Sequence, residues 1–307
     1  MSGSSRLKKP IRERLMQKTN EIREHISAIE QTRKITNAME MISSNRMRQV
    51  MAHIEHNRRY FSYLRRSMKE ILASTQDVSH PFLIRRERNH RTYIVIAGDK
   101  GFCGAHNSTV LNFALERFNA HPGSTIITLG HTAEAFFRSH NIIPDRCVFG
   151  IVQDPTLNRA REVAGDLTNL YENSDTDEIF VIYTSFYGET KRQPIEARLL
   201  PVILHDYVDI RDAEVLESIM YHPSAQDVLD LMIPQFIIGL VFGVMVQAYA
   251  SEQFARMTAM RSATTNAKEM IDKLKMQYNL ARQSAITNEL AEIADAAEML
   301  KGGDEYE

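Results

Sequence analysis

The chain has 307 residues, of which 43% are hydrophobic and 25% are charged, and its formal net charge is −2. This composition is close to the average of globular proteins and allows one or two domains. The two cysteines, Cys103 and Cys147, are too few for a disulfide scaffold and lack the spacing of a metal site, so we expect two reduced thiols.

Positive charge gathers in the first third of the chain. Residues 1–91 contain 20 Lys and Arg against 9 Asp and Glu, and the rest of the chain has an excess of negative charge. A basic segment of this kind suits nucleic acid, an acidic membrane surface or an acidic protein partner. The most apolar stretch, residues 236–246, is much shorter than the roughly 20 residues of a membrane span, so we expect a buried helix there.

Two long stretches, residues 11–80 and 244–301, contain neither glycine nor proline. Each is far longer than an ordinary helix of about 8–20 residues. In the first stretch, apolar residues recur at alternating three- and four-residue spacing, which is typical of a coiled coil. The residues with this spacing are Ile22, Ile26, Ile29, Ile35, Met39, Ile42, Met47, Val50, Ile54, Phe61, Leu64, Met68 and Ile71.

The second stretch has the same spacing from Met257 to Ala285. After Ala285 the pattern shifts by one residue and continues at Ile286, Leu290 and Ile293. Helices of this length cannot bury both faces in one globular core, so we expect them to pack on each other.

The middle of the chain has a different pattern. Short β-branched runs at residues 93–96, 125–129 and 179–183 predict strands, and a fourth run covers residues 195–204. Helical patterns lie between them, at residues 108–119, 133–140 and 157–171. Strands that alternate with helices predict a mostly parallel sheet.

The predicted fold class is therefore α/β, with a long antiparallel coiled coil of the two terminal helices and a small α/β domain whose sheet is mostly parallel. The expected parts are an N-terminal extension (1–20), an N-terminal coiled-coil helix (11–80), an α/β domain (92–205), a connector (206–223), a C-terminal coiled-coil helix (224–301) and a tail (302–307).

A glycine-rich turn, residues 97–107 (AGDKGFCGAHN), follows the first predicted strand. Turns of this kind can aim backbone N–H groups at a phosphate. Gly98, Gly101 and Gly104, however, have neither the dinucleotide fingerprint nor the phosphate-loop spacing, so we expect a structural turn. Nothing else in the sequence indicates a catalytic group, a metal site or a cofactor.

Three segments share their pattern with one protein family. They are residues 31–42 (QTRKITNAMEMI), residues 97–107 and residues 250–290, which contain ASEQFARMTAM and YNLARQSAITNEL. On these motifs, in this order, the chain resembles the gamma subunit of F-type ATP synthases over residues 20–295.

The resemblance implies a rotor shaft. In that family the terminal helices form an antiparallel coiled coil inside a hexamer of alternating alpha and beta subunits, and the α/β domain contacts the membrane c-ring beside the epsilon subunit. The resemblance thus implies one non-catalytic copy per complex, without cofactor or metal. It also implies a peripheral position on the cytoplasmic face of a bacterial plasma membrane, without insertion into it. Whether protons or sodium ions drive the complex depends on another subunit.

Single positions are carried over from the family motifs. The positions that resemble contacts with the alpha/beta hexamer are Met39, Arg256, Arg282, Gln283, Thr287 and Glu289. Tyr221, His222 and Pro223 resemble a Tyr-x-Pro motif of the rotor foot, the part that meets the ring, although His222 stands where an acidic residue is expected. The chain also starts earlier than the family pattern, and we expect residues 10–20 to extend the N-terminal helix along the C-terminal one.

Two other interpretations are open on the sequence. The basic N-terminal segment suggests a coiled-coil nucleic-acid-binding or scaffold protein, whose nucleic-acid binding would depend steeply on salt. The glycine-rich turn suggests a nucleotide-dependent enzyme. Neither accounts for residues 250–290, so we expect no nucleic-acid partner and no catalytic activity of the chain itself.

Overall fold

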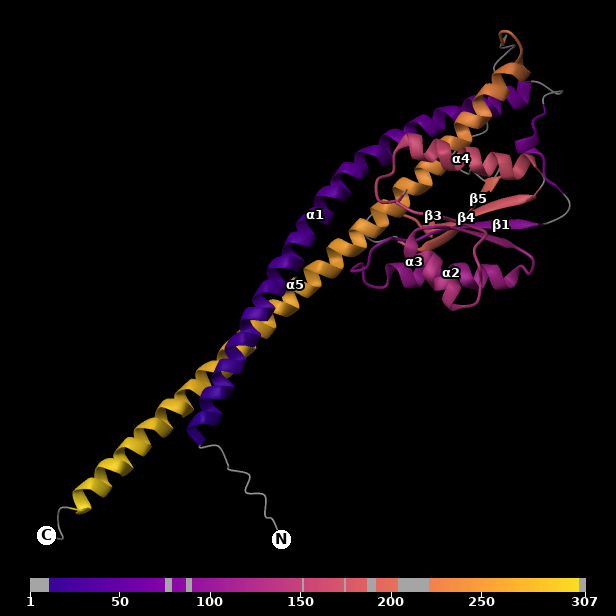
Figure 1. Ribbon diagram of the computed structural model, residues 1–307. Helices are drawn as coiled ribbons and strands as arrows, with labels where there is room; N and C mark the ends of the chain where they lie inside the picture. The colour runs from indigo at the N-terminus through magenta and orange to yellow at the C-terminus, as the bar shows by residue number, and fades with distance from the viewer. Residues whose placement is uncertain are drawn as a thin grey trace, which may run out of the picture. The chain divides into compact units, whose positions relative to one another are not determined.

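The computed structural model (Figure 1) describes residues 11–74, 79–86, 90–150, 152–173, 175–186, 192–203 and 221–303. The expected connector therefore lies outside the described residues except for 221–223, as does the tail beyond residue 303. The elements are α1 (Ile11–Ser74), a short 3-10 helix (Pro81–Leu83), β1 (Arg91–Ile96), α2 (His106–Ala120), β2 (Thr125–Leu129), α3 (His131–Ser139), β3 (Arg146–Val148), α4 (Leu157–Glu172), β4 (Glu178–Thr184), β5 (Pro194–Leu200) and α5 (Ala225–Gly303). The predicted fold class is confirmed.

The chain forms two compact units. We call the first the coiled-coil unit, Met1–Glu40 with Met260–Glu307, and the second the α/β unit, Met41–Ala259. Both long helices, α1 and α5, contribute residues to both units. The sequence analysis expected each long helix to be a part of its own, whereas each unit contains a portion of both helices. The expected domain boundaries stay a prediction.

A five-stranded sheet in the order β3-β2-β1-β4-β5 is the centre of the α/β unit. The first four strands are parallel, and β5 runs antiparallel to β4. The sheet is therefore mostly parallel, as predicted. The sequence analysis missed β3, because this edge strand has only three residues and none of them is fully buried.

Strand β1 shows how the sheet separates two layers. Tyr93 and Val95 belong to one core with α2 and α3, whereas Ile94 and Ile96 belong to the other core with α4 and the long helices. This alternation follows from the two-residue period of a strand. Figure 1 shows α2 and α3 on one side of the sheet and α4 on the other.

The apolar stretch 236–246 is part of the larger core. The Phe236 ring contacts the Phe61 ring of α1 edge-on, with 5.6 Å between the centroids. A Cβ atom at Gly239 would lie 1.7 Å from the Phe61 ring, so glycine permits this close helix contact. Among the described residues, α5 is long and apolar enough to cross a membrane, and a core helix has the same composition. Phe236, Ile237 and their neighbours are buried, as expected for a core helix.

The coiled-coil pattern is confirmed for α1 from Met47 onward, but it is wrong at two positions before it. Ile35 and Ile42 are exposed. Thr36 and Ser43 are buried in their place, one residue further along. In the coiled-coil unit the Thr36 hydroxyl shares a hydrogen bond of 2.8 Å with the Thr264 hydroxyl of α5. Small side chains fit where two helix backbones approach closely, and a search for large apolar residues overlooks them.

A second correction concerns the end of α5. Ile271 and Ala267 are buried at the interface, as predicted, but Ile286, Leu290 and Ile293 are exposed. The one-residue shift turns Ile286 away from α1, because successive residues lie about 100° apart around a helix. Leu290 and Ile293 lie where α5 continues past the beginning of α1 at Ile11 (Figure 1). The apolar pattern therefore continues past the packed interface. The expected helical extension is present in that α1 begins at Ile11.

Candidate partner-contact surface and glycine turn

The coiled-coil unit exposes most of the side chains that the resemblance marks as partner contacts. Arg282, Gln283, Thr287 and Glu289 lie on the C-terminal part of α5, and all four are exposed. Arg282 and Glu289 also line a hollow of about 220 Å³ together with Thr19 of α1. The exposed Arg282 guanidinium and Gln283 amide can therefore form charge-assisted hydrogen bonds with another protein.

Met39 is placed differently from these four residues. Its side chain is half-buried, because it lies one turn beyond the buried Thr36 on the same side of α1. Of the two methionines in this segment, Met41 is the exposed one. The described geometry therefore leaves part of Met39 accessible and most of Met41.

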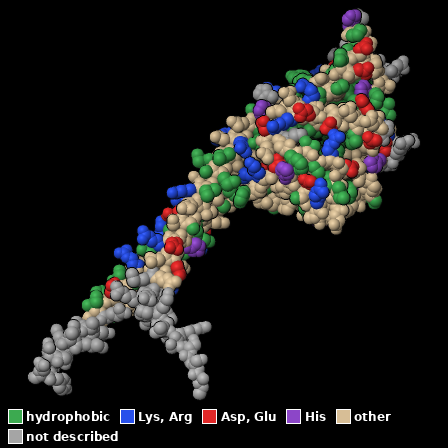
Figure 2. Space-filling model, viewed as in Figure 1, with side chains coloured by type: hydrophobic (Ala, Val, Ile, Leu, Met, Phe, Trp, Pro, Cys, Tyr) green, Lys and Arg blue, Asp and Glu red, His purple; other side chains and the backbone are tan. Residues whose placement is uncertain are grey.

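Several large apolar side chains of the coiled-coil unit are exposed as well. They are Ile35, Met270, Met276, Leu280, Ile286, Leu290 and Ile293. Figure 2 shows apolar, basic and acidic side chains interspersed along the viewed face of this unit. Apolar side chains so frequent on a surface are typical of a region that another protein covers.

Arg256 does not belong to this exposed set, although the resemblance places it among the positions that contact the hexamer. Its guanidinium bonds the Glu252 carboxylate at 2.5 Å, and the two side chains are only 9% and 6% exposed. It also donates to the carbonyl oxygens of Lys100 (3.2 Å) and Gly101 (3.3 Å). The reason for the difference is the glutamate one turn earlier, which holds the arginine inside the α/β unit.

Glu252 also explains a glycine of the turn. A Cβ atom at Gly98 would lie 2.8 Å from the Glu252 carboxyl carbon, so only glycine fits without movement of that buried group. Gly104 has φ of +59°, the left-handed region that glycine adopts without strain. Gly101 has open space around it, and its carbonyl oxygen is the part that Arg256 uses. Burial raises the pKa of Glu252, and the Arg256 guanidinium opposes that shift.

The direction of the backbone groups in the turn argues against nucleotide binding. A phosphate loop presents N–H groups to the anion. Here the carbonyl oxygens of Lys100 and Gly101 point at Arg256, and the Gly98 N–H donates to the Asn107 side chain at 3.0 Å. The Gly98 N–H therefore serves the α/β unit itself, and two carbonyl oxygens of the turn face a cation of the same chain.

His106 lies beside the same cluster. Burial, together with the positive charges of Arg256 and Arg192, lowers its pKa to about 4. Burial also raises the pKa of the neighbouring Cys103 thiol. At neutral pH both side chains are therefore uncharged, and they do not add to the charge of the Glu252–Arg256 pair.

The Asp99 carboxylate fastens the turn to α3 and to the loop before α4. It accepts hydrogen bonds from the His131 backbone N–H and from the Gln153 side chain, both at 2.8 Å. The first of these satisfies an N–H at the beginning of α3, where a helix has no internal partner for it. The Asp99 carboxylate and the Glu252–Arg256 pair thus both hold the turn in place.

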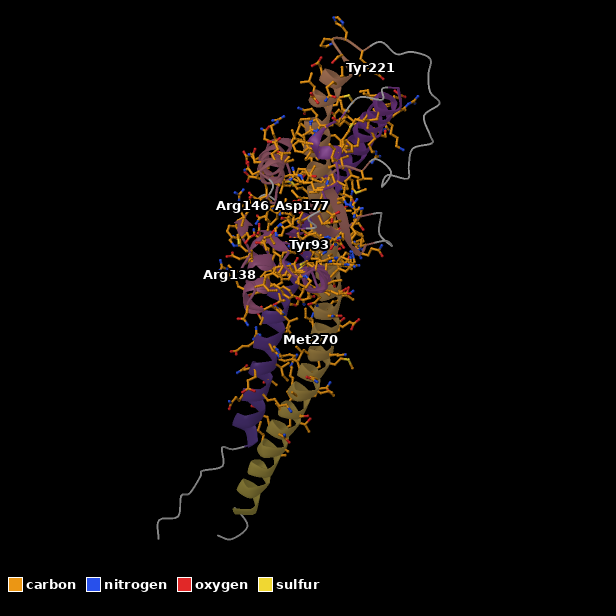
Figure 3. The ribbon with its side chains drawn as sticks, turned by 90° about the vertical axis from the view of Figure 1, so that its right-hand side faces the viewer. Tyr93, Arg138, Arg146, Asp177, Tyr221 and Met270 are labelled. Atoms are coloured by element: carbon orange, nitrogen blue, oxygen red, sulfur yellow. The ribbon has the colours of Figure 1, made fainter. Side chains whose placement is uncertain are left out.

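The three predicted foot residues lie just before α5. Tyr221 is half-buried against the larger core, and Figure 3 shows it beside the first turn of the helix. His222 and Pro223 are exposed. Ser224 then caps the helix, because its hydroxyl accepts from the Asp227 N–H at 3.1 Å. Tyr221 is therefore fixed to the core, and His222 and Pro223 are accessible.

Sequence reasoning missed Glu252, Asp99 and Thr264 as functional positions. A signal for Glu252 was present, since it stands four residues before Arg256, on the same face of the helix. No local signal marks Asp99 or Thr264, whose partners are far away in the sequence. Within the residues that the structure describes, no three His, Cys, Asp or Glu side chains are grouped so as to hold a metal ion.

Comparison with known proteins gives a consistent result. The sequence model of the ATP synthase family matches residues 18–300. The ATP synthase gamma chain of Ruminiclostridium cellulolyticum is 34% identical over 288 residues, which cover 92% of this chain and 98% of that protein. A gamma chain of Acetobacterium woodii, named as sodium ion specific, is 31% identical over 301 residues, which cover 93% of this chain and 100% of the relative.

Solved structures have the same fold. A chain of the Euglena gracilis mitochondrial ATP synthase aligns with a TM-score of 0.66 at 16% identity and covers 94% of this chain and 97% of its own. A chain from the central stalk and c-ring of the Tetrahymena thermophila enzyme aligns with a TM-score of 0.58 at 20% identity, over 75% of this chain and 99% of its own. Since the family model matches most of the sequence and the relatives exceed 30% identity over nearly their whole length, the chain belongs to the ATP synthase gamma chain family.

Proposed function

We propose that this chain is the central rotor shaft of an F-type ATP synthase. It transmits torque between the ion-translocating ring in the membrane and the alpha/beta hexamer, and so couples the flow of protons or sodium ions to ATP synthesis or hydrolysis. The chain itself is a non-catalytic subunit. The observation that carries the proposal is the exposed surface of the coiled-coil unit, in a chain of the gamma family.

The physical argument rests on how two helices can transmit torque. A pair of helices held by interface residues such as Ile271 and Thr36 is stiff, yet it cannot bury the apolar side chains on its outer faces. Leu280 and Met276 are such side chains, and they are largely exposed. A surrounding ring of subunits would cover these side chains. Because the side chains are unevenly distributed around the helices, rotation of the shaft would push the surrounding subunits.

The partners follow from the same role. The coiled-coil unit lies within the alpha/beta hexamer, and the foot at Tyr221, His222 and Pro223 faces the c-ring beside the epsilon subunit. One copy serves each complex. The complex is bound to the plasma membrane of a bacterial cell on its cytoplasmic face, and this chain stays outside the bilayer. A nucleic-acid partner is not favoured, because membership of the gamma family gives it no support.

We assign direct hexamer contact to Met39, Arg282, Gln283, Thr287 and Glu289. Arg256 has a different task. It is a positioning residue, because its guanidinium ties α5 to the glycine turn within the α/β unit. A change at Arg256 therefore acts on the hexamer through the shape of the shaft.

Reconstitution of the full chain with alpha and beta subunits tests the proposal. We expect a stable complex that hydrolyses ATP, and we expect the double variant Arg282→Ala/Gln283→Ala to lower turnover about fivefold, since each change removes a charge-assisted or polar contact. The variant should fold normally, because both side chains are exposed.

A matched control comes from α4. Arg161 and Asn158 are exposed and bond each other at 3.0 Å, so Arg161→Ala/Asn158→Ala removes a similar pair of polar groups from the α/β unit. Turnover should not change in this variant. If the wild-type chain failed to assemble with alpha and beta, the rotor assignment would be wrong. If both variants lowered turnover equally, the contact assignment would be wrong while the rotor role stood.

A further inference from the structure

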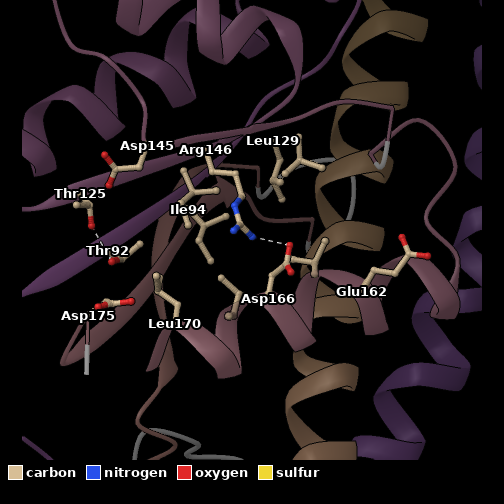
Figure 4. A pocket seen from close by; sticks show the side chains of 14 residues that line it. Thr92, Ile94, Thr125, Leu129, Asp145, Arg146, Glu162, Asp166, Leu170 and Asp175 are labelled. Carbon is tan, nitrogen blue, oxygen red and sulfur yellow. Dashed lines mark hydrogen bonds and ion pairs between the residues drawn. The ribbon is translucent and has the colours of Figure 1, made fainter. Parts of the chain in front are cut away.

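The α/β unit contains a cavity that the rotor role does not use. It has a volume of about 380 Å³ and lies between α4 and the part of the sheet formed by β1, β2 and β3 (Figure 4). Small-molecule sites in proteins begin at about 300 Å³. The cavity is therefore large enough for a small organic ligand.

The inner wall of the cavity is apolar. It is formed by Ile94, Ile127, Leu129, Val148, Val163, Leu167 and Leu170. Two hydroxyl groups also reach it, from Thr92 and Thr125, but they bond each other at 2.8 Å. This wall therefore offers mainly burial of an apolar body.

The rim of the cavity is acidic. Four carboxylates, those of Asp145, Glu162, Asp166 and Asp175, stand there with one cation, Arg146. Arg146 bridges Asp166 at 2.7 Å, as Figure 4 shows. In the described part of the chain the other three carboxylates have no ion-pair partner, so the rim has an excess of three negative charges. A ligand with a positive head would be favoured by this field.

A bare metal ion fits these observations less well. Among the described residues no group of three metal-ligating side chains is close enough to hold one. Divalent ions need several oxygen ligands around a single point. The carboxylates of the rim are spread around an apolar opening, which suits one positive group attached to an apolar body.

We propose that this cavity is a binding site for an amphipathic organic cation, a molecule with an aliphatic or aromatic body and an ammonium or guanidinium head. The body lies against the wall formed by α4 and the sheet, and the head lies at the end of the cavity where Asp145 and Asp175 stand (Figure 4). Arg146 limits binding, because its guanidinium already neutralises Asp166 and adds positive charge to the rim.

The test uses the full chain and three probes with the same octyl body, n-octylammonium, n-octanol and n-nonanoate. Binding is followed by the methyl NMR signals of Leu167, Leu170 and Val163. We expect n-octylammonium to bind at least about fivefold more tightly than n-octanol and n-nonanoate to bind most weakly, because the bodies are the same and the charge of the head falls from positive to neutral to negative. Equal affinity for the ammonium and the alcohol would overturn the proposal.

Two changes at the rim should act in opposite directions. Arg146→Gln should tighten n-octylammonium binding about threefold, and Asp145→Asn/Asp175→Asn should weaken it about fivefold. All three residues are exposed, so the variants should fold. Glu116→Gln, an exposed carboxylate of α2 outside the cavity, is the matched control and should have no effect.

The remaining outcomes are also decisive. Competition by magnesium chloride beyond that of sodium chloride at equal ionic strength would identify an inorganic cation site instead and would overturn the proposal. Loss of binding in Leu170→Phe, with the melting temperature unchanged, would support the cavity as the place where the body binds. Retained binding in that variant, or an unchanged affinity in Arg146→Gln, would contradict it.

Discussion

The two units of the molecule differ in how far they bury large apolar side chains. In the α/β unit, large apolar side chains such as Leu111 are buried between helices and sheet. In the coiled-coil unit, Leu280 is 63% exposed and Ile35 is 60% exposed. A sheet with helices on both faces can cover its apolar residues, whereas two helices can cover only one side of each other. The first unit is therefore stabilised from within, and the second has apolar surface left for a partner.

Ion pairs show the same difference. Arg256 and Glu252 in the α/β unit are 9% and 6% exposed, whereas Arg261 and Glu40 in the coiled-coil unit are 64% and 20% exposed. Both pairs have short contacts, so distance does not distinguish them. Burial distinguishes the two pairs, because a buried charge that loses its partner has no water to solvate it and destabilises the fold. The following predictions test this contrast between the units, from the largest expected effect to the smallest.

The largest effect should come from Glu252→Ala. The change leaves the Arg256 guanidinium buried with only the carbonyl oxygens of Lys100 and Gly101 as partners. We expect the free energy of unfolding of the α/β unit to fall by about 3–5 kcal/mol. Chemical denaturation followed by circular dichroism measures it.

Glu252→Gln is the control for this prediction. It keeps the shape and one oxygen acceptor, so it should cost clearly less than the alanine variant. A loss below about 1 kcal/mol in Glu252→Ala would show that water reaches Arg256, and the contrast between buried and exposed pairs would then fail.

The next effect concerns two leucines. Leu111→Ala, in the buried core against the sheet, should lower the free energy of unfolding by about 3 kcal/mol, because it removes packed methyl groups and leaves a cavity. Leu280→Ala should cost less than about 0.5 kcal/mol in the isolated chain. In the complex with alpha and beta subunits, however, Leu280→Ala should weaken assembly. Equal losses in the isolated chain would mean that Leu280 is already covered.

Much of the fold could be predicted from the sequence, since it rests on periodic patterns. The β-branched runs of β1, β2 and β4 and the three- and four-residue spacing of α1 and α5 are local signals. What could not be predicted is the choice between neighbouring positions. Ile35 looked like an interface residue and is exposed, and Thr36 is buried, because close approach of two helices favours a small side chain.

The site could be predicted in part for a similar reason. The family motif gave Arg282 and Arg256 the same role, and the structure separates them by burial. A motif records which residue stands at a position, but not which side chains from distant segments surround it. The partners of Arg256 in the glycine turn lie more than 150 residues earlier in the chain, so only the folded structure brings them together.

A third prediction uses pH. Since the pKa of His106 is about 4 in the folded chain and about 6.5 when unfolded, the unfolded state binds the proton first. The contribution of the neutral His106 to the free energy of unfolding is fully present above pH 6.5 and is lost as the pH falls toward 4. Solvent screening reduces the effect because the side chain is partly exposed, so we expect His106 to lower the free energy of unfolding by about 2 kcal/mol at pH 4.5. His106→Asn should lack this part of the pH dependence.

The measurement for His106 is the difference between the wild type and the variant in the free energy of unfolding, at pH 7 and at pH 4.5. Taking the difference removes the contribution of carboxylates that titrate in the same range. Parallel curves for the two proteins would contradict the prediction. They would show that the positive charges of Arg256 and Arg192 do not act on the ring.

The smallest effect should come from the exposed pair Arg261–Glu40, whose nitrogen and oxygen lie 2.8 Å apart. A double-mutant cycle with Arg261→Ala and Glu40→Ala, measured by amide exchange in the coiled-coil unit, should give a coupling of about 0.2–1 kcal/mol. The coupling should vanish in about 1 M salt, where screening acts over roughly 3 Å. The same cycle on Arg256 and Glu252 should give a larger coupling that salt hardly changes. If the Arg261–Glu40 coupling exceeded about 1.5 kcal/mol or resisted salt, burial would not be what separates the two pairs.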